Sequence, residues 1–162
     1  MNTSVQQAYE AELQTRGFQS DPAQQRAVDA LDRCARDWAA YKDKRSNAFK
    51  KLINRPDVPR GVYMYGGVGR GKSFLMGCFF NAVPIRRKVR LHFHEFMREV
   101  HRELAALQGT VNPLDVLGER ISKRYKLICF DEFHVADITD AMILHRLLVS
   151  LFENGVGFVT TS

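Results

Sequence analysis

The sequence predicts an α/β fold in which a parallel sheet lies between layers of helices. Short apolar segments alternate with segments of helical spacing along most of the 162 residues. One apolar segment, at residues 62–65, leads into a glycine-rich loop and then a helix. Another, at residues 127–130, ends in two carboxylates. Because ligands of such sheets bind at the carboxyl ends of the strands, we expect both stretches to belong to one site.

The residues before the glycine-rich loop are predicted to be helical. A short helix within the first 20 residues is expected to end near Gly17. Asp21 followed by Pro22 is typical of a helix N-cap and first helical position. Apolar residues then recur at spacings of three and four, which indicates an amphipathic helix; they are Ala27, Leu31, Cys34, Trp38 and Tyr41. We expect this helix to continue into a basic segment and to end before Pro56.

The elements after the loop follow the same alternation. In order, we predict a helix at 71–81, a strand at 88–93, a helix that ends at Gly109, a helix that starts at Asn112, a strand at 127–130, a helix at 138–153 and a strand at 156–161. The run 127–130 is apolar at every position, which places it in the interior of a parallel sheet. Asp137 is the expected N-cap of the helix at 138–153.

The glycine-rich loop fits the pattern G-x-x-x-x-G-K-[ST] at every fixed position. The matched residues are Gly66, Gly67, Val68, Gly69, Arg70, Gly71, Lys72 and Ser73. Glycines let successive backbone N–H groups turn toward a polyanion, and the following helix adds the positive end of its dipole. In this pattern the lysine reaches the β- and γ-phosphates and the hydroxyl ligates Mg²⁺. The loop therefore predicts binding of a nucleoside triphosphate with Mg²⁺.

The carboxylates after the buried strand predict hydrolysis. Asp131 stands where P-loop proteins place the carboxylate that holds Mg²⁺, which makes Ser73 and Asp131 the expected metal ligands. Glu132 can take a proton from an attacking water, so Glu132 and Lys72 are the candidate catalytic residues. The polar residues 160–162 at the end of the fourth strand could orient that water, or they could be no more than the polar end of a strand.

Charge and cysteine content restrict the classes of partner and compartment. The formal net charge is +6, with basic residues concentrated at 42–60 and again at 86–90. Such clusters could bind nucleic acid or an acidic partner. We favour a solvated face of a nucleotide-binding domain and do not expect nucleic acid as the partner. The three cysteines are widely spaced in apolar contexts, which predicts buried, reduced thiols in a cytoplasmic protein.

With these motifs placed, the chain resembles the AFG-one-like ATPases, a group of AAA+ proteins. The resemblance rests on residues 21–24, 61–73, 92–97 and 130–144, the last of which is more specific than the two nucleotide-site motifs. It implies an AAA+ type P-loop fold and an ATPase linked to the bacterial division ring protein FtsZ. It also implies homo-oligomerisation with ATP and a peripheral position at the inner face of the membrane. Gln24 occupies a place like the adenine-contacting glutamine of some helicases, although a glutamine on a helix surface is an equal alternative.

The resemblance also sets an expectation for domain organisation. We divide the chain into a helical segment with a basic stretch at 1–60 and a P-loop ATPase core at 61–162. In the family the strand ending at Ser162 is followed by an asparagine sensor, a further strand, an arginine finger and a lid. We therefore expect a core truncated before its last strand and lid, with the P-loop strand at the sheet edge and weak turnover.

Three functions are compatible with these residues. The first is an ATP-hydrolysing mechanoenzyme of the cell division machinery. The second is a nucleotide-gated interaction module in which hydrolysis only resets binding to a partner. The third is a nucleic-acid motor or helicase-loader-like ATPase, suggested by Gln24 and the basic segment 42–60.

Overall fold

A four-stranded parallel sheet forms the centre of the molecule in the computed structural model, which describes residues 4–17, 19–65 and 70–162. The elements in chain order are α1 (Val5–Arg16), α2 (Pro22–Lys44), α3 (Ala48–Ile53), β1 (Val62–Met64), α4 (Arg70–Ala82), β2 (Lys88–His92), α5 (Phe93–Ala106), α6 (Pro113–Arg124), β3 (Leu127–Asp131), α7 (Ile138–Glu153) and β4 (Gly157–Thr161). The predicted alternation of strands and helices is confirmed, and most predicted bounds agree with these to within one or two residues.

The strand order in the described sheet is β1-β4-β3-β2. All three neighbouring pairs are parallel, so every strand points its carboxyl end toward the same side. β3 lies inside the sheet and is buried along its whole length, as its continuous apolar run predicted. β1 lies at one edge of this sheet, where the sequence placed the P-loop strand.

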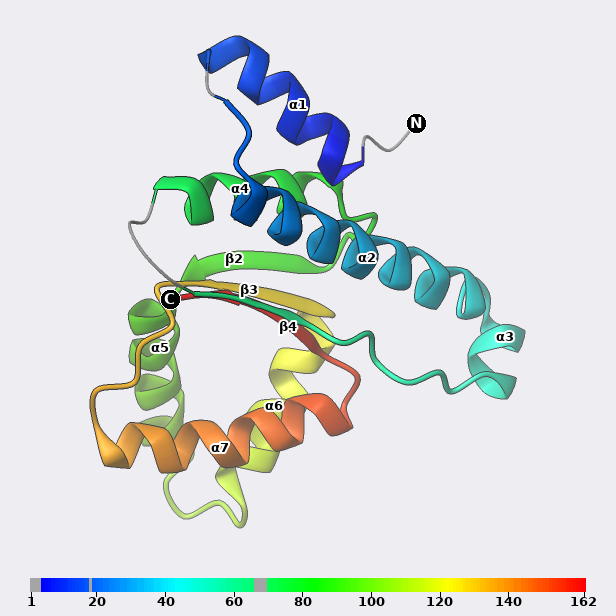
Figure 1. The fold of residues 1–162 in the computed structure, drawn as a ribbon. Coiled ribbons are helices and arrows are strands. Elements are labelled where there is room, and N and C mark those ends of the chain that lie inside the picture. Colours follow the sequence, from blue (N-terminus) through cyan, green and yellow to red (C-terminus); the bar gives the residue numbers. More distant parts are fainter. Residues whose placement is uncertain (1–3, 18, 66–69) are drawn as a thin grey trace.

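Helices cover both faces of the sheet. Figure 1 shows α1, α2 and α4 on one side and α5, α6 and α7 on the other. Each side has its own apolar core, and both cores include residues of β3. Within the described ranges, no helix combines the length and the apolar character that crossing a membrane requires.

The N-terminal helices begin and end where the sequence indicated, and a further short helix follows them. The Asp21 carboxylate caps α2 by accepting the backbone N–H groups of Ala23 and Gln24. As predicted, this helix enters the basic segment 42–60 and ends before Pro56, and its last residue is Lys44. Asn47 then starts α3 by accepting the backbone N–H of Lys50 at 2.7 Å. A local side-chain cap of this kind competes with continued helix, and the apolar spacing of α2 did not reveal it.

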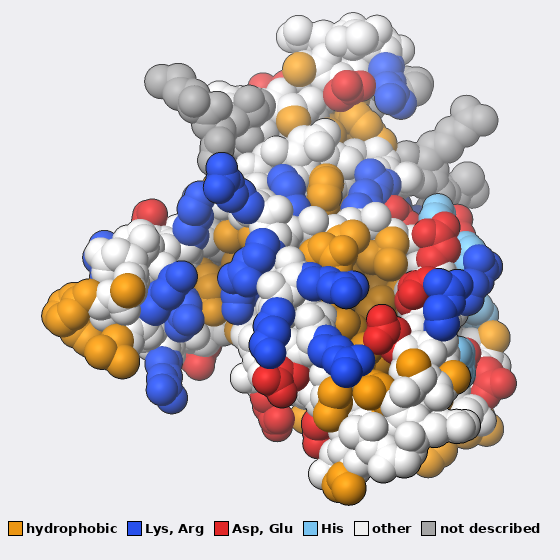
Figure 2. Space-filling view, turned by 180° about the vertical axis from the view of Figure 1, so that it is seen from behind, with side chains coloured by type: hydrophobic (Ala, Val, Ile, Leu, Met, Phe, Trp, Pro, Cys, Tyr) orange, Lys and Arg blue, Asp and Glu red, His pale blue; other side chains and the backbone are white. Residues whose placement is uncertain are grey.

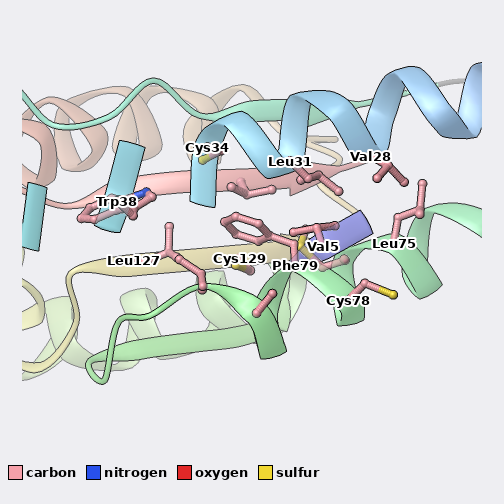
Figure 3. Packing of buried hydrophobic residues seen from close by; sticks show 14 of the residues in the cluster. Val5, Val28, Leu31, Cys34, Trp38, Leu75, Cys78, Phe79, Leu127 and Cys129 are labelled. Carbon is pink, nitrogen blue, oxygen red and sulfur yellow. The ribbon is translucent and has the colours of Figure 1, made fainter. Parts of the chain in front are cut away.

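The core beneath α2 fixes that helix against the sheet. Trp38 is 1% exposed, and it lies among Cys34, Leu127 and other apolar residues (Figure 3). A Cβ atom at Gly157 would lie 2.4 Å from Trp38 Cζ2, so only glycine lets β4 pass this close to the indole. The helix that carries Gln24 is thereby held at a set distance from the strands that carry the site.

The three cysteines are free and buried, as the sequence predicted. Burial raises the pKa of Cys34 to about 11 and that of Cys129 to about 12, because the apolar surroundings disfavour a thiolate. Burial also raises the pKa of Cys78. The thiols are therefore protonated at neutral pH and act as small apolar side chains of the core.

Candidate functional site

The candidate site lies where the carboxyl ends of the strands meet the start of α4. Figure 1 shows the C-terminal end of the chain and the first turn of α4 at the same edge of the sheet. Of the predicted phosphate loop, Gly66, Gly67, Val68 and Gly69 lie outside the described residues. Arg70 is described only as the first backbone position of α4. The described part of the site is built from α4, β2, β3 and β4.

Asp131 and Ser73 converge on one cation, the guanidinium of Arg90. Arg90 Nε donates to Asp131 Oδ2 at 2.6 Å, and Nη2 donates to Oδ1 at 3.2 Å. The same Nη2 donates to Ser73 Oγ at 3.0 Å and to the Ser73 backbone oxygen at 2.9 Å. The two residues predicted to ligate Mg²⁺ are thus brought together around a positive charge. Hydroxyl and carboxylate oxygens are suitable Mg²⁺ ligands, so this donor set fits the expected ion.

The role of Arg90 was missed at the level of sequence. Its interpretation as part of a solvated basic face is wrong, because its side chain is 26% exposed and bonded to two residues of the site. The alternation of side chains along strand β2 could have indicated that role. Lys88, Arg90 and His92 fall on one face of the strand, and Arg90 and Lys88 both reach α4 or the turn after it.

Glu132 follows β3 in an unusual backbone conformation. Its φ of 54° lies in the left-handed region, which a non-glycine residue seldom adopts. Its backbone N–H donates to Thr161 Oγ1 at 3.2 Å, and the next N–H, of Phe133, donates to the Thr161 carbonyl at 2.6 Å. Two hydrogen bonds to one residue of β4 therefore hold the chain in this turn. They favour a positioning role for the end of β4 over a merely polar strand terminus.

The side chain of Glu132 is 76% exposed. His92, at the end of β2, brings Nδ1 to 3.6 Å from Glu132 Oε2. This Nδ1 atom is buried and has no hydrogen-bond partner within the part of the chain that the structure describes. A small movement of the Glu132 side chain would bring the two atoms within hydrogen-bond distance, so His92 can orient the carboxylate.

Lys72 projects from the first turn of α4 toward the end of β4. Its amine donates to the backbone oxygen of Ser162. The backbone N–H of Ser162 in turn donates to the Met64 carbonyl at 3.0 Å, which continues the pairing of β4 with β1. The Lys72 side chain therefore extends from the start of α4 to the carboxyl end of β4.

Gln24 lies against the start of α4. Its Oε1 accepts the Tyr9 hydroxyl at 2.8 Å, which fixes the orientation of the amide. Its Nε2 lies 2.8 Å from where a Cβ of Gly71 would stand, so a side chain at that position would displace the Gln24 amide. Gln24 also lines a cleft of about 1010 Å³ between α1 and α4, together with Ser73, Phe74 and Arg90. The fold thus brings Gln24 to the site.

The parallel sheet with helices on both faces is the architecture of the AAA+ type P-loop fold. AMPPCP-bound DnaA from Aquifex aeolicus aligns with 91% of this chain and 41% of its own at a TM-score of 0.55 and 16% identity. DnaI aligns with 88% of this chain and 67% of its own at a TM-score of 0.53 and 18% identity. At these identities the likeness concerns the fold alone.

The chain belongs to the AFG1-like ATPase family, whose model matches residues 3–162. Cell division protein ZapE of Escherichia coli K12 is 53% identical over 103 residues, which cover 64% of this chain and 28% of that protein. Lactation elevated protein 1 homolog B of Danio rerio is 42% identical over 120 residues, which cover 67% of this chain and 24% of that protein. The chain thus spans about a quarter of the length of these curated relatives.

Replacing Thr161 by valine tests how the turn at Glu132 is held. The change leaves the Glu132 N–H without its acceptor, so we expect the free energy of unfolding to fall by about 1–3 kcal/mol. Urea denaturation followed by the fluorescence of Trp38, the single tryptophan, measures the loss.

Thr160→Val is the matched control, because side chains alternate along a strand and Thr160 faces the other side of the sheet. Its unfolding free energy should stay within about 0.5 kcal/mol of the parent. Equal losses in both variants would contradict a specific role for the Thr161 hydroxyl.

Proposed function

We propose that this protein binds ATP with Mg²⁺ and hydrolyses it. The observation that carries the proposal is the convergence of the Ser73 hydroxyl and the Asp131 carboxylate on one cation at the start of α4. Next to them, Glu132 is held in a strained turn of the kind that clusters at active sites. Membership of the AFG1-like ATPase family supports the same reaction.

On this proposal, each described residue of the candidate site has a role in binding or in proton transfer. Ser73 and Asp131 would hold Mg²⁺, which neutralises charge on the phosphates when it is bound. Lys72 would move from the Ser162 backbone oxygen to the β- and γ-phosphates, which carry several negative charges. Gln24, its amide oriented by Tyr9, would contact the base from the cleft beside α4.

Glu132 would act as the general base. Its side chain is 76% exposed, so a water can reach the carboxylate. It can accept the proton of that water as the water attacks the terminal phosphate, and His92 would keep the carboxylate from turning away. A correctly placed general base typically contributes about 10²- to 10⁴-fold to the rate.

Two substitutions separate binding from hydrolysis. Glu132→Gln should keep nucleotide affinity while turnover falls by about 10²- to 10⁴-fold, because the amide cannot accept the proton. Lys72→Ala should lose affinity for the nucleotide itself. Equilibrium binding of a fluorescent ATP analogue and release of phosphate measure the two effects. Turnover unchanged in Glu132→Gln would contradict the assigned base.

The output of the cycle is proposed to lie in the cell division machinery. The support is the similarity to ZapE, which is named as a cell division protein. On this proposal the partner is FtsZ, ATP drives homo-oligomerisation, and the site of action is peripheral, at the inner face of the membrane. The same Glu132→Gln variant distinguishes a mechanoenzyme from a nucleotide-gated module. Remodelling of FtsZ polymers that persists without hydrolysis would favour the module.

A second candidate is an ATPase activated by nucleic acid, and a surface feature favours it. The basic segments 42–60 and 86–90 meet around Lys126, whose pKa is lowered by burial and then by Arg87, Arg45 and Lys51. We call these four residues the cationic cluster. Figure 2 shows Lys and Arg side chains gathered across this face. Such a concentration of positive charge is suited to a phosphate backbone.

The charge-reversed double variant Lys51→Glu, Arg55→Glu tests this candidate. If it holds, DNA stimulates turnover of the parent, the stimulation weakens steeply with salt, and the variant loses it. Arg55 lines the same cleft of about 490 Å³ as Lys51 and Lys126. Arg98→Glu, on the exposed face of α5, is the control. Turnover of the parent that does not respond to DNA would remove the candidate.

A further inference from the structure

Arg90 occupies the place between the two predicted metal ligands. One of its nitrogens, Nη2, lies 3.0 Å from Ser73 Oγ and 3.2 Å from Asp131 Oδ1. Arg90 Nε also donates to the carboxylate, at 2.6 Å, so the ion pair is bidentate. The Asp131 side chain is only 12% exposed, so this guanidinium supplies the main compensation of a largely buried charge.

A guanidinium in this position and a Mg²⁺ ion exclude each other. Mg²⁺ draws its oxygen ligands in to about 2.0–2.1 Å, and the Nη2 atom stands between the same two oxygens. Two cations sharing one partly buried carboxylate would also repel each other. The site can therefore be paired with Arg90 or loaded with the metal, but not both.

We propose that Arg90 is a substitute cation of the metal site. It holds Ser73 and Asp131 together while no Mg²⁺-nucleotide is bound, and it must leave them when one binds. The inference rests on the proposed function and adds that the need to release Arg90 lowers the apparent affinity for Mg²⁺-nucleotide. Because only the released state is competent for the metal, the apparent affinity for Mg²⁺-nucleotide is reduced by the fraction of molecules in which Arg90 is released.

The surroundings allow the release. Arg90 lines the cleft of about 1010 Å³ beside α4, so its side chain has open space on one side. Gly77, one turn further along α4, leaves room there as well, since a Cβ at that position would lie 3.2 Å from Arg90 Nη1. Neighbouring Lys88, in contrast, is bonded to the carbonyls of Phe80 and Val83 and does not touch the site.

The test compares Arg90→Gln with Lys88→Gln, a charge removed from the same face of the same strand. The dissociation constant of a fluorescent, non-hydrolysable ATP analogue is measured in Mg²⁺ and in EDTA. We expect Arg90→Gln to bind the Mg²⁺-analogue about tenfold more tightly than the parent, which corresponds to release of Arg90 in about one molecule in ten. In EDTA the parent and Arg90→Gln should bind alike, and Lys88→Gln should match the parent in both buffers.

Weaker or unchanged binding of the Mg²⁺-analogue by Arg90→Gln overturns the proposal. Weaker binding by Arg90→Gln in Mg²⁺ would mean that Arg90 contacts the bound nucleotide, and equal binding would mean that it does not compete. A parent that binds the analogue in neither buffer would overturn the proposed function as well, which distinguishes the two failures. If Arg90→Gln does not fold, Arg90→Lys is measured in its place, because a lysine cannot make the bidentate contact with Asp131. It should also bind more tightly in Mg²⁺, by a smaller factor, and weaker or unchanged binding contradicts the proposal.

Discussion

The carboxylate of Asp131 has to be balanced, because it ends a strand that is buried from its first residue to its last. An ionised group that is largely removed from water is tolerated only when it is paired and hydrogen-bonded. The guanidinium of Arg90 supplies both conditions, and in doing so it brings Ser73 of α4 to the end of β3. The relative positions of the helix and the strand at the site thus depend on one charge that must be neutralised.

The two cores deliver Asp131 to that point. α1, α2 and α4 pack on one face of β3, and α5, α6 and α7 pack on the other. The parallel register then places His92 beside Asp131, and the turn after β3 is bonded to the end of β4. Side chains from three strands and one helix meet without any of them belonging to a long loop. This rigidity suits a site whose function requires oxygen ligands at fixed separations.

The sequence was informative where local pattern decides the structure. The bounds 138–153 agree with those of α7, and the Asp21 cap was predicted, because capping and helical spacing act over a few residues. The position of Asp131 and Glu132 could be predicted for a similar reason, since an apolar run that ends in carboxylates marks the end of a buried strand. The phosphate loop itself, at residues 66–69, lies outside the described residues, so its geometry stays a prediction.

Contacts between segments that are distant in the sequence could not be predicted from local patterns. Arg90 lies 41 residues from Asp131 in the sequence, and its basic neighbours suggested a surface. Only the parallel pairing of β2 with β3 shows that the two side chains meet. The role of Thr161 depends in turn on the left-handed turn at Glu132, a conformation that no residue preference indicates for glutamate. Pairing and strain of this kind are properties of the folded chain.

We propose that Ser73, Asp131 and Lys72 together hold a Mg²⁺-nucleotide at the start of α4. A crystal structure of the protein with Mg²⁺ and a non-hydrolysable ATP analogue tests it most directly. We expect the Ser73 hydroxyl on the metal, the Asp131 carboxylate turned to the metal or to its water, and the Lys72 amine moved from the Ser162 carbonyl to the phosphates. A nucleotide bound elsewhere, with Lys72 still on Ser162, would contradict the account.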